Sequence, residues 1–181
     1  MVHITGVIFV VAFFHAYSAK QMHYEFQRVE QVGGEDMFDC QIRIRKFNRT
    51  APVITGPTTY FKDMDNTYTL EMKTAYSPLG NNQFNEYPMS FKKQNLCDFV
   101  NTTYREYQEF LKEPGTNYTQ VTGEGLCPWP KGTYSFNDLL LTDTSPVPPV
   151  IPSGLWRATF VYQGPNDQKG SILFFIKVWY T

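Results

Sequence analysis

The chain has 181 residues, of which 42% are hydrophobic and 18% charged, so it can build the core of one domain and is not intrinsically disordered. Its formal charge of −1 provides no electrostatic attraction for nucleic acid or for an anionic membrane surface. Aromatic residues make up 17% of the chain, which is unusually many. This surplus of rings indicates either an oversized core or the wall of an apolar pocket.

Residues 1–18 predict a secretory signal peptide. Residues 4–14 are nearly all apolar, and Ala16 and Ser18 provide the small side chains that precede a cleavage site. Cleavage after Ala19 is the alternative. The apolar stretch is shorter than the roughly 20 residues of a membrane-spanning helix. We therefore expect residues 19–181 to form one soluble, extracellular domain without stable membrane insertion.

Alternating apolar and polar residues predict β-strands along most of the mature chain. Clear patterns cover residues 38–45, 68–76 and 155–162, and residues 172–180 return after a turn as the second strand of a hairpin. This last strand is apolar on both faces, so we expect it to be covered on both sides. Weaker patterns predict strands at residues 24–32, 57–62, 87–92 and 133–140.

Residues 96–111 interrupt the β pattern and predict an amphipathic helix. At about 100° per residue, the apolar side chains share one arc: Leu96, Phe99, Val100, Tyr104, Tyr107, Phe110 and Leu111. Asn95 is placed to cap the start, Asp98 lies in the first turn, and Pro114 ends the helix. The apolar stripe is best explained as a face that covers a core, with a partner-binding face as the alternative.

Three cysteines in a disulfide-permissive compartment allow one intramolecular bridge and leave one thiol. We expect the bridge between Cys97, at the helix start, and Cys127, before a turn-forming Pro-Trp-Pro run. It would close a loop of about 30 residues and stabilise the fold by roughly 3–4 kcal/mol. Cys40 lies on the apolar face of its strand and is expected to be a buried thiol, with pairing between two chains left open.

Three N-glycosylation sequons begin at Asn48, Asn101 and Asn117, and in a secreted chain these side chains should face solvent. Asn101 falls on the polar side of the predicted helix, as glycosylation would require. Residues 142–152 hold four prolines and predict an extended, polyproline-like lip.

The residues of an enzyme site are missing from the sequence. After signal cleavage the chain retains one histidine, His23, near the new N-terminus, and it has no Gly-x-Ser-x-Gly elbow. It also lacks zinc-ligand spacing and a Gly-rich phosphate loop. Carboxylate pairs such as Glu35-Asp36 are typical of solvated turns. We predict that the protein is not an enzyme and uses no cofactor or metal.

Four segments carry a resemblance to a known family: CQIRIRKFNRT at 40–50, LCDF at 96–99, CPWPKGTY at 127–134 and PSGLWR at 152–157. Their order resembles a secreted insect family, a domain-of-unknown-function group that includes the CheA and CheB chemosensory proteins. That group is distantly similar to the ganglioside activator protein and the ML lipid-recognition superfamily. The likeness covers about residues 24–180. One departure is that relatives often carry a cysteine upstream of the one matching Cys40, and residues 32–36 have none.

The resemblance implies a mainly β fold over residues 19–181, a single ML-like domain. This would be an immunoglobulin-like antiparallel β-sandwich whose sheets splay apart around a hydrophobic ligand, with one helix near one end. It further implies a role in taste or pheromone organs and binding of a lipid or long-chain hydrocarbon.

We therefore expect a secreted carrier or co-receptor component that binds an apolar ligand such as a lipid, a glycolipid or a hydrocarbon pheromone. The alternative is an extracellular module with a solid core that recognises a receptor or another secreted protein. Pocket candidates are aromatic or aliphatic residues of the strands, with Trp129 and the proline lip near the mouth, although each could instead be plain core. They are Tyr68, Leu70, Met72, Trp129, Trp156, Phe160, Phe174 and Ile176.

Overall fold

The computed structural model describes residues 21–47, 51–111, 115–140 and 151–181. The described part has nine strands: β1 (Met22–Gly33), β2 (Phe38–Cys40), β3 (Arg43–Phe47), β4 (Ala51–Tyr60), β5 (Thr69–Ser77), β6 (Asn85–Asn95), β7 (Gly132–Leu139), β8 (Gly154–Gln163) and β9 (Lys169–Tyr180). A helical segment between β6 and β7 is made of α1 (Leu96–Phe99), η1 (Val100–Tyr104), α2 (Arg105–Tyr107) and η2 (Gln108–Leu111). The predicted signal peptide, Asn48 and residues 142–150 of the proline lip lie outside the described residues.

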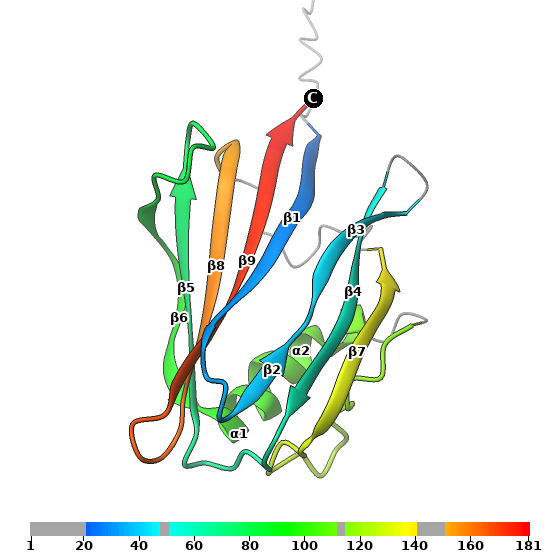
Figure 1. The fold of residues 1–181 in the computed structure, drawn as a ribbon, viewed down its shortest axis with the longest axis vertical. Coiled ribbons are helices and arrows are strands. Elements are labelled where there is room, and N and C mark those ends of the chain that lie inside the picture. Colours follow the sequence, from blue (N-terminus) through cyan, green and yellow to red (C-terminus); the bar gives the residue numbers. More distant parts are fainter. Residues whose placement is uncertain (1–20, 48–50, 112–114, 141–150) are drawn as a thin grey trace, which may run out of the picture.

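The strands form two antiparallel sheets that face each other (Figure 1). One sheet has the order β1-β9-β8-β5-β6, and the other has β4 at its centre, with β2 and β3 along one side and β7 along the other. A strand is found at each predicted position, so the predicted mainly β, two-sheet sandwich with one helical segment is confirmed.

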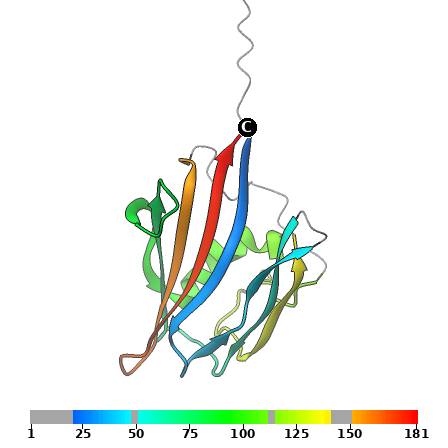
Figure 2. The ribbon, with the colours of Figure 1, turned by 45° about the horizontal axis from the view of Figure 1, so that its top comes forward.

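The sheets come together at one end and splay apart at the other, where β1 begins and β9 ends (Figures 1 and 2). At the narrow end, β1 passes directly into β2 and connects the sheets. Gly34 and Gly170 allow the close approach, because a Cβ on Gly170 would lie 2.5 Å from the Cα of Gly34. The fully buried ring of Phe38 packs beside both glycines. The helical segment runs from the β6 side toward the β7 side and closes the sandwich along that flank.

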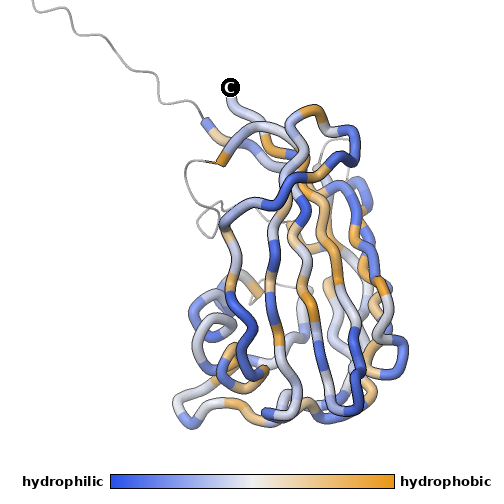
Figure 3. Tube along the Cα trace, turned by 90° about the vertical axis from the view of Figure 1, so that its left-hand side faces the viewer, coloured by the Kyte–Doolittle hydropathy of each residue, from blue (hydrophilic) through white to orange (hydrophobic). Residues whose placement is uncertain are grey.

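Strand register places one apolar face of the five-stranded sheet toward the other sheet. On β8 and β9, Phe160 pairs with Ile172 and Ala158 pairs with Phe174, so all four side chains share one face. Hydrophobic stretches are visible along the strands of the molecule in Figure 3. This face forms one wall of the interior.

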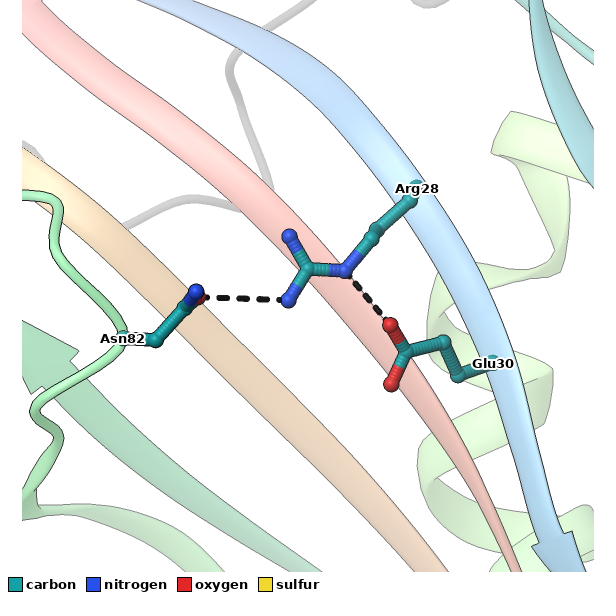
Figure 4. Close-up of polar contacts among 3 residues, drawn as sticks. All are labelled: Arg28, Glu30 and Asn82. Atoms are coloured by element: carbon teal, nitrogen blue, oxygen red, sulfur yellow. Dashed lines mark hydrogen bonds and ion pairs between the residues drawn. The ribbon is translucent and has the colours of Figure 1, made fainter.

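The outer face of β9 is also covered, as its apolar sequence on both faces predicted. Phe84, from the loop between β5 and β6, packs edge-on against Phe175, and the Arg28 guanidinium lies 3.6 Å from the centre of the Phe175 ring. Arg28 reaches Glu30 on its own strand (2.6 Å) and Asn82 in the same loop (3.3 Å), as Figure 4 shows. Phe175 is therefore only 3% exposed on a face that the sandwich does not bury.

The predicted strand at residues 38–45 is divided into β2 and β3. The Gln41 amide donates to the Pro57 carbonyl (2.8 Å), and the register of β4 against β7 shifts near Gly56. Gly56 has φ +114°, and a Cβ there would lie 2.4 Å from the Gln41 carbonyl oxygen. This bend separates the two strands and leaves Ile42, between them, buried in the interior.

The helix at residues 96–111 is present, but its middle turn is a π-helix and its last turn is 3-10. Asn101 and Thr102 donate side-chain hydrogen bonds to the carbonyls four residues earlier, an interaction that competes with regular α-helix. The wider π-helical turn shifts the buried face of the helix by one residue toward the C-terminus. Gln108 is buried, and Tyr107, which was predicted on the apolar face, is exposed. Asn95 occupies the N-cap position but makes no side-chain capping bond, which also differs from the prediction.

Candidate ligand-binding cavity

A cavity of about 490 Å³ lies between the two sheets and the helical segment. This volume is within the range of about 300–1,000 Å³ that is typical of small-molecule sites. No charged residue is among those that line it. The lining residues are Phe26, Ile42, Ile54, Thr58, Tyr60, Leu70, Leu96, Phe99, Val100, Tyr104, Leu111, Tyr118, Trp129, Phe136, Leu139, Ala158, Phe160, Tyr162, Ile172, Phe174 and Ile176.

Two hydrophobic clusters contribute to the cavity wall. In the first, Trp129, Tyr60 and Tyr134 pack together where β4 ends and β7 begins, which is the narrow end of the sandwich. The second cluster is centred on Ile42, Ile54, Phe136 and Leu139. Both clusters combine aromatic and aliphatic side chains.

Tyrosine hydroxyls supply most of the polar atoms in the cavity wall. Burial raises the pKa of Tyr60 well above its usual value. Burial likewise raises the pKa of Tyr118 and of Tyr162. These phenols are therefore neutral at physiological pH. Such a wall can donate and accept hydrogen bonds, but it offers no counter-ion to a charged ligand.

Trp129 is fixed by its backbone and by its ring contacts. Its amide donates to the Met64 carbonyl and its carbonyl accepts from the Met64 amide, both at 2.9 Å. Ring centres lie 5.2 Å away at Tyr104, 5.2 Å away at Tyr134 and 6.3 Å away at Tyr60. The side chain is 6% exposed, and its indole Nε1 has no hydrogen-bond partner among the described residues. The prediction placed Trp129 near the mouth, but the structure places it at the narrow end.

The predicted disulfide between Cys97 and Cys127 is present, with a Cα–Cα distance of 5.3 Å. It joins the start of α1 to the loop that positions Trp129. Asn101 adds a second connection, because its side chain accepts from the Leu126 amide (2.7 Å) and donates to the Leu126 carbonyl (3.1 Å). Cys40 is a free, half-buried thiol, and burial raises its pKa. It therefore has the character of an unreactive cysteine.

The predicted pocket residues separate into two groups. Lining the cavity are Leu70, Trp129, Phe160, Phe174 and Ile176. Tyr68, Met72 and Trp156 are not among the residues that line it. Tyr68 precedes β5, and its ring lies close to Gly164 in the β8–β9 turn. Met72 lies on β5 between Phe91 of β6 and Phe160 of β8.

Trp156 belongs to a separate, solid cluster on the same sheet. It packs with Ile151 and Val178, and ring centres of Tyr76 and Tyr87 lie 5.0 and 4.6 Å away. Ile151 packs on Trp156, and the Pro152 carbonyl accepts from the Trp156 Nε1. The described end of the proline lip therefore packs on Trp156 and not on Trp129.

Most of the wall that the prediction missed comes from the four-stranded sheet, the helical segment and the loop before β7. Tyr162 continues the alternation of Trp156 and Phe160 along β8, so the pattern contained the signal for it. Tyr118 lies outside any strand or helix, and no periodicity identifies it.

The sequons differ in their surroundings. Asn101 is half-buried, and its Nδ2 donates to two carbonyls, those of Cys97 (2.8 Å) and Leu126 (3.1 Å), so it does not face solvent as expected. Asn117 is exposed, and its Nδ2 makes one hydrogen bond, to the Thr133 carbonyl at 3.0 Å.

The side chains that could act as catalytic bases or metal ligands are not among the residues that line the cavity. His23 stacks on Trp179, and its Nε2 lies 2.7 Å from the Thr181 hydroxyl, away from the lining residues. Within the described ranges, no three His, Cys, Asp or Glu side chains are grouped as metal ligands. None of the described helices combines the length and hydrophobicity of a membrane span.

Two of three comparisons with known proteins return matches. A family model described as a protein of unknown function, DUF1091, matches residues 69–158, just under half of the chain. No curated protein matches the sequence. Six chains of solved structures match, among them a Niemann-Pick type C2 protein from the Japanese carpenter ant. That chain is 14% identical, the alignment covers 84% of this chain and 89% of that one, and the TM-score is 0.26, too low to support an argument about ligand or mechanism.

Proposed function

We propose that the protein is a carrier that holds an apolar, lipid-like molecule in the cavity between its two sheets. The observation that supports this is the cavity of about 490 Å³, whose lining contains no charged residue. Protein interiors are normally packed with few voids larger than a water molecule, and cavities destabilise a fold in proportion to their volume. A cavity of this size is therefore a feature that binding explains and stability does not.

The apolar wall can provide substantial binding free energy. Burial of one methylene group contributes about 0.8 kcal/mol, so twelve would provide about 10 kcal/mol before the costs of ordering are subtracted. Micromolar binding requires about 8 kcal/mol. Affinity in this range needs no charged contact, which agrees with the neutral wall.

The cavity also separates this proposal from the alternative. A module that recognises another protein through its surface would be expected to have a solid core. The exposed large hydrophobic residues, such as Val32 and Leu79, are scattered over different strands and loops, and single exposed residues are normal on protein surfaces. An apolar small molecule is therefore the better-supported partner.

Secretion and chemosensation complete the proposal. The signal peptide expected at residues 1–18 and the Cys97–Cys127 disulfide support an extracellular carrier. The DUF1091 match supports the family resemblance seen in the sequence, which connects the carrier to taste or pheromone sensing. Immunolocalisation of the secreted protein to sensory organs is the expected result, and its restriction to other tissues would contradict the chemosensory role.

Tryptophan fluorescence provides a direct test of the cavity. The chain has three tryptophans, and Trp129 is the one that lines the cavity. A W156F/W179F variant therefore reports on Trp129 alone, and the matched W129F/W179F variant reports on Trp156 in its solid cluster. Titration of delipidated protein with long-chain lipids should change Trp129 emission saturably and leave Trp156 emission nearly unchanged. Equal, unsaturable changes in both variants would contradict the proposal.

Native mass spectrometry of protein purified from its own tissue would then identify the ligand. A bound mass that is released by organic solvent and belongs to a lipid or hydrocarbon is the expected result.

A further inference from the structure

Two tyrosines of the cavity wall differ from other tyrosines of the fold in what their hydroxyls contact. The hydroxyls of Tyr76, Tyr104 and Tyr180 each donate to a main-chain carbonyl oxygen, at 2.6–2.7 Å. The hydroxyls of Tyr60 and Tyr162 have no main-chain acceptor among the described residues, and they interact with each other. Their hydrogen-bonding capacity is therefore not used by the backbone.

These two tyrosines face each other across the sandwich. Tyr60 is the last residue of β4 in one sheet, Tyr162 lies near the end of β8 in the other, and both line the cavity. Their ring centres are 6.5 Å apart, and the fully buried ring of Phe38 lies 6.2 Å from Tyr60 and 5.1 Å from Tyr162. Apolar contacts therefore hold the pair at the narrow end of the sandwich, where β4 and β8 end.

The cavity reaches both hydroxyls. Among the described residues, the side-chain polar atoms that are enclosed by protein and lack a hydrogen-bond partner are Gln120 Oε1, Trp129 Nε1 and Arg157 Nε. The hydroxyl oxygens of Tyr60 and Tyr162 are not enclosed in this way, although they form no hydrogen bond of regular geometry. Because both side chains line the cavity, the open space beside these oxygens is the cavity itself.

The pair offers a ligand both a donor and an acceptor. Each hydroxyl has one proton to donate and lone pairs that accept. Burial raises the pKa of Tyr60 and of Tyr162, so both keep their protons at physiological pH. When one hydroxyl donates to the other, the proton of the second and a lone pair of the first stay free. A ligand group that donates and accepts at once satisfies both.

We propose that Tyr60 and Tyr162 bind the hydroxyl group of a long-chain alcohol, which donates to one phenol oxygen and accepts from the other. This inference rests on the proposed carrier function. An ether or a ketone accepts hydrogen bonds but does not donate them, and a hydrocarbon does neither. A carboxylate at this place would be desolvated without a counter-ion, because no charged residue lines the cavity.

The extent of the cavity explains why the alcohol carries a long chain. Ile54 also lines the cavity and lies six residues before Tyr60 on β4. At about 3.3 Å per residue, these two positions are about 20 Å apart. The hydrocarbon part of the ligand therefore extends from the tyrosine pair along β4 toward Ile54, with its polar group at the narrow end.

A competition experiment compares ligands of similar length that differ in hydrogen bonding. Bound N-phenyl-1-naphthylamine, a neutral fluorescent probe, is displaced from delipidated protein by 1-hexadecanol, by 1-methoxyhexadecane or by hexadecane. The alcohol should compete about tenfold better than the alkane, as expected for two buried hydrogen bonds of modest net strength. The ether, which accepts but does not donate, should lie between them.

Tyrosine-to-phenylalanine variants identify the hydroxyls that are responsible. In Y60F and in Y162F, the preference for the alcohol over the alkane should fall to about threefold or less, because one of the two hydrogen bonds is lost. The control Y104F removes the hydroxyl of another tyrosine of the wall, one that bonds the Thr119 carbonyl, so it should keep the full preference. A full preference in both Y60F and Y162F would overturn the inference.

A second measurement leaves the wall unaltered. With 1-hexadecanol labelled with ¹³C at its hydroxyl-bearing carbon, isotope-filtered NOEs should connect the labelled protons to the rings of Tyr60 and Tyr162 and not to Ile54. Equal affinities for the three competitors, or NOEs from this carbon to Ile54, would overturn the inference but leave the carrier function intact. Absence of saturable binding by the probe and by all three competitors would instead overturn the carrier function and this inference with it.

Discussion

The two buried tryptophans occupy regions of opposite character, one in a solid cluster and one beside a cavity. Trp156 lies in a solid cluster, where Ile151 and Val178 cover it and its Nε1 is bonded to Pro152. Trp129 lies in the wall of a cavity, where three tyrosine rings surround it and its Nε1 is unpaired. An aromatic residue in the sequence therefore predicts that its side chain is buried. Whether that side chain packs in a solid core or lines a cavity depends on the segment that covers it.

The covering segments explain this difference. The chain just before β8 returns over Trp156, and the Tyr180 hydroxyl fixes it there by bonding to Ile151 on both its amide (3.2 Å) and its carbonyl (2.6 Å). At Trp129 the covering element is the helical segment, whose Tyr104 ring lies 5.2 Å from the Trp129 ring and whose first turn is joined to the loop of Trp129 by the disulfide. The segment before β8 packs directly on its sheet, whereas the helical segment encloses the cavity.

The largest effect is expected from removing the solid tryptophan. W156A should lower the free energy of unfolding by about 3–5 kcal/mol, because a large buried side chain leaves a cavity that its neighbours cannot fill. The matched W129A variant enlarges a cavity that already exists, so it should cost less. Denaturant unfolding of both variants measures the difference. A larger loss for W129A would show that the cluster around Trp129 is core and not binding site.

Removal of the disulfide tests the enclosing cover. A C97A/C127A variant should lose roughly 3–4 kcal/mol of stability, because a loop of about 30 residues is no longer closed in the unfolded chain. Affinity for apolar ligands should fall as well, since the bridge connects α1 to the loop of Trp129. The C40A variant is the control, because Cys40 is unpaired, and it should leave ligand affinity unchanged. Unchanged ligand affinity in the C97A/C127A variant would show that the cover keeps its position without the bridge.

The strands were predictable because each buries one face, and that requirement produces a period-two pattern. Phe160, Phe174 and Ile176 were recognised as wall residues for the same reason. Tyr118 and the helical residues of the wall were not, since their positions depend on contacts between segments distant in the sequence. The exposure of Tyr107 was hidden from periodicity because side chains of Asn101 and Thr102 widen one helical turn.

The two described sequons extend the comparison to glycosylation. An N-linked glycan replaces one Nδ2 hydrogen, and Asn101 uses both of its hydrogens on backbone carbonyls. Mass spectrometry of the secreted protein should therefore find a glycan on Asn117 and none on Asn101. Substitution N101A should cost about 1–3 kcal/mol, because it leaves partly buried backbone groups unpaired.

The control T103A removes the same sequon while keeping the Asn101 side chain, so it should be close to neutral. N117A should cost less than N101A, since water can replace hydrogen bonds at an exposed site. Equal losses in T103A and N101A would indicate that a glycan, and not the hydrogen bonds, is what stabilises this region.

Alkaline pH should act on the tyrosines of the cavity. Tyrosines of the unfolded chain ionise near pH 10, whereas burial raises the pKa of Tyr60 and Tyr162 in the folded protein. The folded state therefore holds these protons more tightly, and its stability is constant below about pH 10 and falls as the pH rises further. Phenolate absorbance should rise together with unfolding. In Y60F the rise in phenolate absorbance should correspond to one phenol fewer. A gradual titration of all tyrosines before the protein unfolds would contradict their burial.

The smallest change in stability is expected when a larger side chain fills the cavity. This substitution distinguishes an open cavity from a packed core most directly. Ala158 lines the cavity, whereas Ala75 is 5% exposed on the opposite face of the same sheet, where it pairs with Arg157. A158L should change stability by less than about 1 kcal/mol, because the new methyl groups enter open space, but it should reduce ligand affinity about tenfold or more. A75L makes the same substitution in packed surroundings, so it should cost about 1–3 kcal/mol and leave ligand affinity unchanged. If both variants lost stability equally, the space beside Ala158 would already be occupied by protein in solution, and the carrier function would lose its physical basis.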